Sequence, residues 1–316
     1  MVDNWHFIPT AMALIKKTSS THSTAFSIDQ TVVNVTTVDF SDASKPSVRN
    51  AVEEAIDPAL DEQQLKVMVK NHRLPKLTCS LCLDLGEYQL VPMDAPEVPT
   101  QDLPDALKWA VTEFIEQPVD DIVIDFFDVP NSSYRRDIRY VNVVVVNKVT
   151  IEKKAELFKQ AGLKLGIIDI PELAIRNLMN SYHLDEDGVV FVYLAKTSGL
   201  MVFVREKQLY FSRKLDIGSE QLHQNPDRRQ DIALEIQRSL DYVNRHFNKL
   251  TIKRLVVAPT TPALPDLAAF LDKNLAISCD NFDLSRRLGW AQIDTETIKP
   301  TSILSLGAAL RVDEDQ

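Results

Sequence analysis

One succession of secondary-structure elements is predicted twice along this chain of 316 residues. Short runs rich in β-branched residues, separated by tight turns, occupy residues 24–38 and again residues 189–214. Such runs predict antiparallel hairpins. Each run is followed by segments in which amphipathic helices alternate with buried strands. The repetition therefore favours an α/β chain made of two lobes of similar design.

The spacing of apolar residues and the positions of proline and glycine set the expected elements. Residues 77–83 and 87–91 are expected to pair as a further hairpin around Gly86. The predicted strands are 24–28, 31–38, 77–83, 87–91, 122–129, 138–147, 163–168, 189–195, 200–205, 208–214, 252–257 and a short one near residue 277. The predicted helices are 62–70, 102–117, 149–160, 169–182, a long one with an apolar stripe from residue 232 to 247, 263–274 and 303–312.

Two lobes of this kind are typical of the actin-like ATPase and sugar-kinase fold, in which an RNase H-like α/β unit is duplicated. We expect an N-terminal arm at residues 1–24, a first lobe at residues 25–185 and a second lobe at residues 186–316. Residues from about 78 to 150 are expected to form a subdomain inserted in the first lobe.

Glycine is scarce in this sequence. An average content of about 7 % would give roughly 22 glycines, and the chain has 8. The scarcity argues against glycine-rich loops that cradle phosphate groups. The formal net charge of −10 argues against binding of nucleic acid.

Membrane and redox signals are weak. The longest uncharged apolar runs, residues 141–146 and 189–195, are far shorter than the roughly 20 residues of a membrane-spanning helix. Trp5 and two lysines leave open a peripheral contact of the arm with a membrane surface. Cys79 and Cys82 form a CxxC pattern, but in a strand they would point to opposite faces and could hold neither a disulfide nor a metal. A reducing compartment fits these features best.

Several stretches, in order along the chain, carry a resemblance to a known family. Two of them are specific: Ile168–Leu178, with the sequence IDIPELAIRNL, and Leu234–Tyr242, with the sequence LEIQRSLDY. The others are residues 106–109, 117–121, 161–165, 209–213 and 307–311. The chain resembles the MshI family of biogenesis proteins of the mannose-sensitive haemagglutinin (MSHA) type IV pilus. That family is similar to PilM and to the cytoplasmic part of the type II secretion protein GspL.

The resemblance implies an actin-like fold and a non-enzymatic scaffold at the cytoplasmic side of the inner membrane. PilM-like proteins bind the short N-terminal tail of a single-span, PilN-like membrane protein. They couple the pilus assembly ATPase to the periplasmic alignment complex, so that ATPase is a further implied partner. Two alternatives stay open, an ATP-binding switch like PilM and a type II secretion component like GspL.

An active nucleotide site would need small residues and free backbone N–H groups at three loops. PilM-like sequences have Asp-x-Gly at the first turn, where this chain has an aspartate and no glycine. The second turn lacks the aspartate, and the third loop has a proline, which has no N–H, in place of a glycine pair. We therefore expect a pseudo-ATPase without ATP or Mg²⁺, or alternatively a different anion-binding turn around the lysine of the second loop. The degenerate positions are Asp29, Gln30, Lys196, Thr197, Ser198, Gly199, Ala258 and Pro259.

Acidic residues are dense around the junction of the helix predicted at 102–117 and the strand predicted at 122–129. Strand alternation separates Asp125 from Asp128 by face, and no calcium-binding spacing is present. A partner-facing surface is the favoured interpretation, and a basic membrane-protein tail would be its complement. The candidate partner-binding residues are Glu113, Glu116, Asp120 and Asp121.

Two further carboxylates, Asp169 and Glu172, stand where some sugar kinases keep a catalytic group. Their spacing is that of a capping box at the start of a helix, and we interpret both residues in that structural role. No histidine pair or nucleophile motif accompanies them. No catalytic residue and no metal ligand is therefore predicted.

Overall fold

The computed structural model describes residues 21–29, 31–42, 46–56, 60–74, 78–130, 139–247, 250–284, 289–290 and 299–311. Most of the arm predicted at residues 1–24 lies outside these ranges, and so does Gln30. Residues 22–24, which were assigned to the arm, already belong to the first strand.

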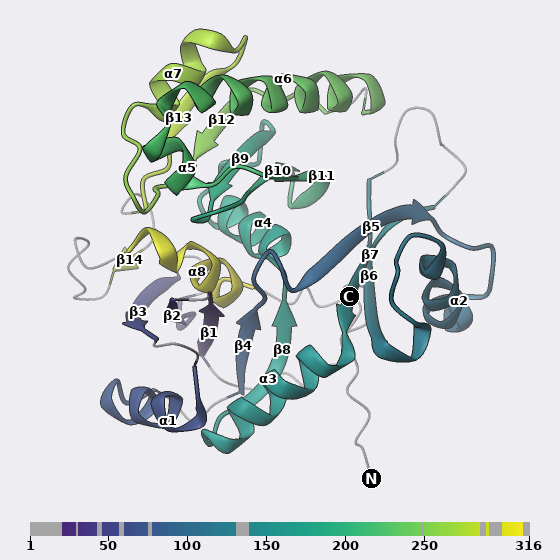
Figure 1. The fold of residues 1–316 in the computed structure, drawn as a ribbon, viewed down its shortest axis with the longest axis vertical. Helices are drawn as coiled ribbons and strands as arrows, with labels where there is room; N and C mark the ends of the chain where they lie inside the picture. Colours follow the sequence, from purple (N-terminus) through teal and green to yellow (C-terminus); the bar gives the residue numbers. More distant parts are fainter. Residues whose placement is uncertain are drawn as a thin grey trace.

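Five strands from the first 169 residues and one short strand from near the end of the chain build a six-stranded sheet (Figure 1). Its first three strands form an antiparallel meander, and two later strands extend the sheet parallel to the first of them. The strand order is β14-β3-β2-β1-β4-β8. These strands are β1 (His22–Ile28), β2 (Val32–Asp39), β3 (Ser47–Ala55), β4 (Thr78–Cys82), β8 (Lys164–Asp169) and β14 (Gly289–Trp290).

The second sheet repeats this plan in the order β11-β10-β9-β12-β13. Its first three strands are again an antiparallel meander, and the last two run parallel to the first. Apart from β14, both sheets thus have the same order and the same strand directions, which confirms the predicted duplication. The strands are β9 (Val189–Leu194), β10 (Gly199–Arg205), β11 (Gln208–Leu215), β12 (Arg254–Val257) and β13 (Ser278–Asn281).

A third, three-stranded antiparallel sheet lies beside the two lobes, with β7 (Tyr140–Asn147) between β5 (Tyr88–Asp94) and β6 (Ile122–Asp128). α2 (Leu103–Ala110) covers its outer face through the buried Leu103 and Leu107, together with Val111, which directly follows the helix. The inner face packs against α4 (Pro171–Ser181), since Tyr88 and Val144 share a core with Leu173. The inserted subdomain is therefore a two-layer unit whose sheet faces the body of the protein.

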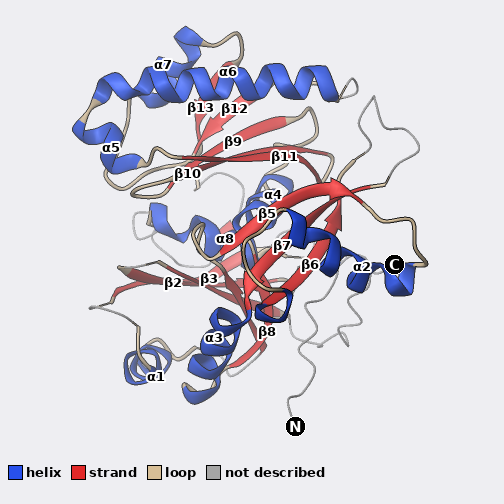
Figure 2. Ribbon diagram, turned by 45° about the vertical axis from the view of Figure 1, so that its right-hand side comes forward, coloured by secondary structure: helices blue, strands red, loops and turns tan. Residues whose placement is uncertain are grey.

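The remaining helices cover the two large sheets (Figures 1 and 2). α4 and α8 (Ile303–Ala309) lie between the sheets and join residues of both lobes in one core. α1 (Glu62–Asn71) and α3 (Lys148–Gln160) pack on the outer face of the first sheet. α6 (Arg229–His246) and α7 (Leu267–Asn274) pack on the outer face of the second, next to α5 (Ser219–Gln224). Short 3-10 helices are η1 (Thr100–Asp102), η2 (Val111–Glu113), η3 (Val119–Asp121), η4 (Pro226–Arg228) and η6 (Pro300–Ser302).

Several predictions differ from the structure. The hairpin around Gly86 is wrong, because β4 pairs in parallel with β1 and β8, while β5 pairs with β7. β4 is buried along almost its whole length, as central parallel strands are, and the separate sheet begins at Tyr88 rather than near residue 78. The polar strand β3 is absent from the predicted elements. Helix α8, expected with the second lobe, packs against β1 and β2 of the first sheet.

Candidate functional site

The turn between β1 and β2 is closed by its own aspartate. Oδ1 of Asp29 accepts hydrogen bonds from the backbone N–H of Thr31 at 2.6 Å and of Val32 at 2.8 Å. It also accepts one from the Thr31 hydroxyl at 2.9 Å. Phosphate oxygens would need such N–H groups in an actin-like nucleotide site, and here a side chain of the same turn already occupies them.

The second turn reaches across to the first. Nζ of Lys196 donates to the Thr31 hydroxyl at 2.6 Å, so one side chain connects the hairpin turns of the two lobes. On its other side the turn is packed against the start of α5, where the N–H of Glu220 donates to the carbonyl of Lys196 at 3.0 Å. A Cβ on Gly218 would lie 2.3 Å from that carbonyl oxygen, which shows how closely these backbones approach.

The third loop follows β12 and is tied to the second. Ala258 is buried and donates its N–H to the carbonyl of Val192 at 2.8 Å, which extends the parallel pairing of β12 with β9. The Ser219 hydroxyl of α5 donates to the carbonyl of Thr261 at 2.7 Å. Hydrogen bonds thus connect all three loops, and the side chain of Lys196 spans from the second loop to the first.

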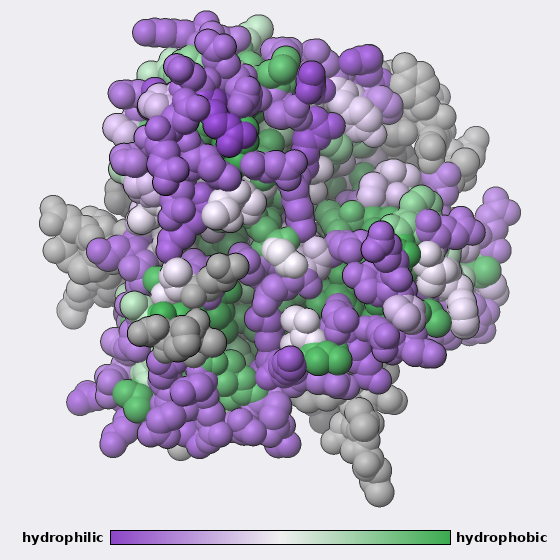
Figure 3. Space-filling view, in the orientation of Figure 1, coloured by the Kyte–Doolittle hydropathy of each residue, from purple (hydrophilic) through white to green (hydrophobic). Residues whose placement is uncertain are grey.

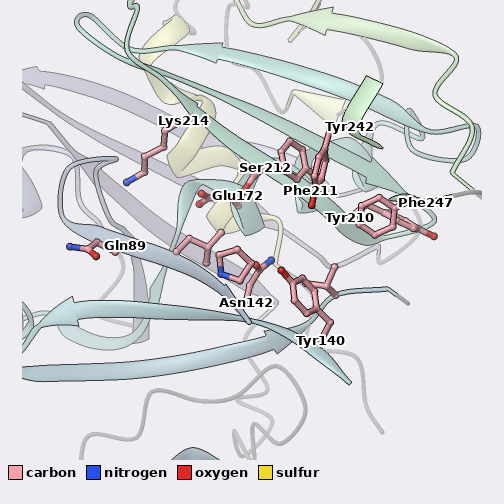
Figure 4. Close-up of a pocket in the computed structure, with 13 residues that line it drawn as sticks. Gln89, Tyr140, Asn142, Glu172, Tyr210, Phe211, Ser212, Lys214, Tyr242 and Phe247 are labelled. Atoms are coloured by element: carbon pink, nitrogen blue, oxygen red, sulfur yellow. The ribbon is translucent and has the colours of Figure 1, made fainter. Parts of the chain in front are cut away.

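A pocket of about 390 Å³ opens between the inserted sheet and the second lobe (Figure 4). One wall is formed by β5 and β7, with Leu90, Pro92, Tyr140 and Asn142, and the other by β11 and α6. Figure 3 shows hydrophobic surface in the hollow between these two parts. The second wall is aromatic and consists of Tyr210, Phe211, Tyr242 and Phe247.

The aromatic wall is built by two ring pairs. Phe211 and Tyr242 have ring centroids 4.9 Å apart, and Tyr210 meets Phe247 edge to face at 5.6 Å. One pair joins strand β11 to helix α6 and the other joins it to Phe247, the residue directly after α6. The rings are thus held from both sides and keep an apolar surface open to the pocket. Sequence reasoning did not identify these residues, although the segment LYFSR at residues 209–213 belongs to the resemblance described above.

A buried carboxylate lies at the floor of the pocket. Glu172 is 1 % exposed and accepts a hydrogen bond from the Tyr88 hydroxyl. Burial raises the pKa of Glu172 above its usual value. Nζ of Lys214 lies 4.4 Å from the centroid of the Tyr88 ring and donates to the carbonyl of Tyr88 at 3.0 Å. The side chain of Lys214 therefore joins the second lobe to the inserted sheet at the end of the pocket.

The predicted capping box at Asp169 and Glu172 is wrong. Ile170 is the N-cap residue of α4, and no side chain caps the helix. Asp169 accepts a hydrogen bond from the N–H of Ile170 at 2.9 Å and lies 3.6 Å from Nη1 of Arg311. Glu172 bonds to Tyr88 instead, because the inserted sheet brings that hydroxyl to the first turn of the helix.

Asp125 gives the fold a pH dependence that can be measured. Burial raises its pKa from 3.8 to about 7, although the N–H of Phe126 donates to it at 2.8 Å. Between these two pH values the folded protein keeps a proton that the unfolded chain releases, so stability falls as pH rises. We expect Asp125→Asn to raise the free energy of unfolding by roughly 1–3 kcal/mol at pH 8 and to change it little at pH 4.

Urea unfolding at both pH values measures this difference, with Asp120→Asn as a control at an exposed carboxyl. A gain for Asp125→Asn that is equal at both pH values would refute the assignment of the proton to Asp125.

The four acidic residues predicted to bind a partner are all exposed: Glu113, Glu116, Asp120 and Asp121. They lie on η2, η3 and the segment between them, at the side of the inserted sheet that α2 covers. The pocket is on the opposite face of that sheet. The structure therefore does not bring the acidic residues together with the pocket, and their role in partner binding stays a prediction.

The cysteines lie as predicted. Cys79 and Cys82 of β4 are both buried, and they belong to different cores on the two faces of the sheet. Burial raises the pKa of both thiols. Within the described ranges, no group of three His, Cys, Asp or Glu side chains is arranged to hold a metal ion. In the same part of the chain, no helix combines the length and apolarity that a bilayer crossing requires.

This architecture is similar to that of several solved structures. A chain of the PilM–PilN type IV pilus biogenesis complex superposes with a TM-score of 0.75, at 17 % identity, over 93 % of this chain and 99 % of its own length. The chain has an actin-like fold. The cytoplasmic domain of EpsL, an inner-membrane component of the Vibrio cholerae type II secretion system, gives 0.52 at 11 % identity, covering 91 % and 94 % of the two chains.

A Bacteroides thetaiotaomicron protein with an actin-like ATPase fold gives a TM-score of 0.51, at 11 % identity, over 86 % of this chain and 93 % of its own. No protein-family model matches the sequence, and no curated protein matches it by sequence. The assignment of the fold therefore depends on similarity in three dimensions and not on sequence similarity.

Proposed function

We propose that this protein is a non-enzymatic scaffold of the MshI type in the inner-membrane platform of a type IV pilus. In this proposal it lies at the cytoplasmic side of the membrane and binds the cytoplasmic tail of a PilN-like single-span protein. The similarity in fold to a chain of the PilM–PilN complex, over nearly the full length of both, supports the choice of platform and partner.

The pocket between the inserted sheet and the second lobe is the observation that carries the binding role. β5 and β11, which line it from two sides, are edge strands of their sheets within the described part of the chain. Edge strands offer unpaired backbone groups to an extended peptide, and aromatic side chains between them offer apolar contacts. An extended tail whose apolar side chains enter between the rings fits this arrangement.

The contacts at the hairpin turns support the absence of catalysis. Asp29 occupies the N–H groups of its own turn, and Lys196 spans from the second turn to the first. Binding of nucleotide there would have to break these hydrogen bonds first. The ATP-binding switch therefore remains the less favoured alternative.

A peptide titration tests the proposal. A fluorescent peptide with the sequence of the PilN-like N-terminal tail should bind saturably without nucleotide. Ser212 lines the pocket and is half-buried, so Ser212→Trp should fill it and weaken binding at least about tenfold. Glu152→Trp, at an exposed position of α3, is the matched control and should bind like the wild type. Normal binding by Ser212→Trp would remove the pocket as the tail site.

A further inference from the structure

The outer side of α2 and η2 exposes two large aromatic rings. Trp109 is 66 % exposed and Phe114 is 58 % exposed. Leu103, Leu107 and Val111 of the same helical segment are buried against the inserted sheet, so the segment is anchored without either ring. The packing of the subdomain therefore requires neither ring at the surface, and large exposed aromatic side chains are typical of interaction surfaces.

The segment that carries these rings is strongly acidic. Residues 97–128 contain nine aspartates and glutamates and a single lysine. The exposed Glu113, Glu116, Asp120 and Asp121 make no side-chain ion pair or hydrogen bond with any described residue. Other exposed carboxylates do have partners, for example Asp187, which lies 2.8 Å from Nζ of Lys253. Among the described residues, these four carboxylates thus have no cationic partner of their own.

In Figure 1, α2 lies on the side of the inserted sheet that is turned away from the body of the protein. Val141 and Val143 of β7 pack toward α2, whereas the intervening Asn142 lines the pocket. Successive strand residues point to opposite faces, so the two regions lie on opposite sides of one sheet. A ligand in the pocket leaves the outer side of α2 accessible.

We propose that the exposed residues Trp109, Glu113, Phe114, Glu116, Asp120 and Asp121 form an acidic aromatic face that docks an arginine-rich amphipathic segment of a second partner protein. A guanidinium group stacks on aromatic rings and pairs with carboxylates, so arginine uses both features of the face. The same carboxylates repel an anionic membrane surface. An uncharged apolar partner would bury the carboxylates without compensation.

The proposal goes beyond tail binding and does not depend on it. The probe is a synthetic amphipathic peptide of arginine and leucine that carries a benzophenone photocrosslinker, titrated against the full chain. We expect saturable binding that weakens with salt, with crosslinks in the segment that contains Trp109 and Phe114. Trp109→Ala/Phe114→Ala should weaken binding at least about tenfold. Glu113→Gln/Glu116→Gln should weaken it and reduce its dependence on salt.

Two control variants distinguish this face from general attraction to a protein of charge −10. Glu152→Gln/Glu186→Gln removes the same charge at exposed positions elsewhere, and Leu234→Ala removes an exposed apolar side chain of α6. Both should bind like the wild type. The proposal is overturned if all variants bind equally or if the crosslinks lie outside residues 97–128. It is also overturned if the face instead binds phosphatidylserine vesicles in a manner that Trp109→Ala abolishes.

Discussion

Replacing Gly307 by valine should destabilise the protein by about 3 kcal/mol or more. Gly307 lies in α8 where this helix crosses α4, and a Cβ there would lie 2.2 Å from the carbonyl oxygen and 2.6 Å from the carbonyl carbon of Ala174. These are backbone atoms in the core between the two lobes, so the helices would have to move apart. The amide of Asn177, which donates to the carbonyl of Gly307 at 3.3 Å, would lose its partner as well.

Urea unfolding monitored by circular dichroism measures this loss. Gly86→Ala is the matched control, because no atom lies within 4 Å of a Cβ at Gly86. We expect the control to stay within about 0.5 kcal/mol of the wild type. Equal unfolding midpoints for Gly307→Val and the wild type would show that α8 does not pack on α4 in this way.

The second large effect is expected for Phe191→Ala, at about 3–5 kcal/mol. Phe191 of β9 is fully buried in the core that joins the lobes, and its ring meets that of Phe282 edge to face at 5.3 Å. Removal of the ring leaves a cavity that the surrounding strands cannot close, since β9 pairs on both sides. The same substitution at the exposed Phe114 should cost less than about 0.5 kcal/mol.

Differential scanning calorimetry of both phenylalanine variants distinguishes the two environments. Similar losses of melting temperature at positions 191 and 114 would contradict the burial of the first ring and the exposure of the second.

Local sequence patterns were sufficient to predict that the two lobes share one design. Strand runs, tight turns and helical periodicity are set by neighbouring residues, and the meander of β9, β10 and β11 follows directly from them. Local patterns do not determine which strands pair with one another. β4 and β5 are close in sequence and could have formed a hairpin, but the buried character of β4 is satisfied only between β1 and β8.

The candidate site depends on contacts between distant segments. Glu172 has the spacing of a capping residue, yet it bonds to Tyr88, 84 positions away in the chain. The pocket combines residues of β5, β7, β11 and α6, and no local pattern reports their proximity. The opposite facing of Cys79 and Cys82 was predictable because it follows from strand alternation alone.

Titration with MgATP, followed by the melting temperature, tests the central claim of a scaffold that works without nucleotide. A ligand that binds the folded state stabilises it by about 2.7 kcal/mol at a concentration 100 times its dissociation constant. We predict no change in melting temperature at millimolar MgATP, and an affinity for the tail peptide that MgATP leaves unchanged. A saturable rise at sub-millimolar ATP, lost in Lys196→Ala or Asp29→Ala and kept in Lys164→Ala, would contradict the account.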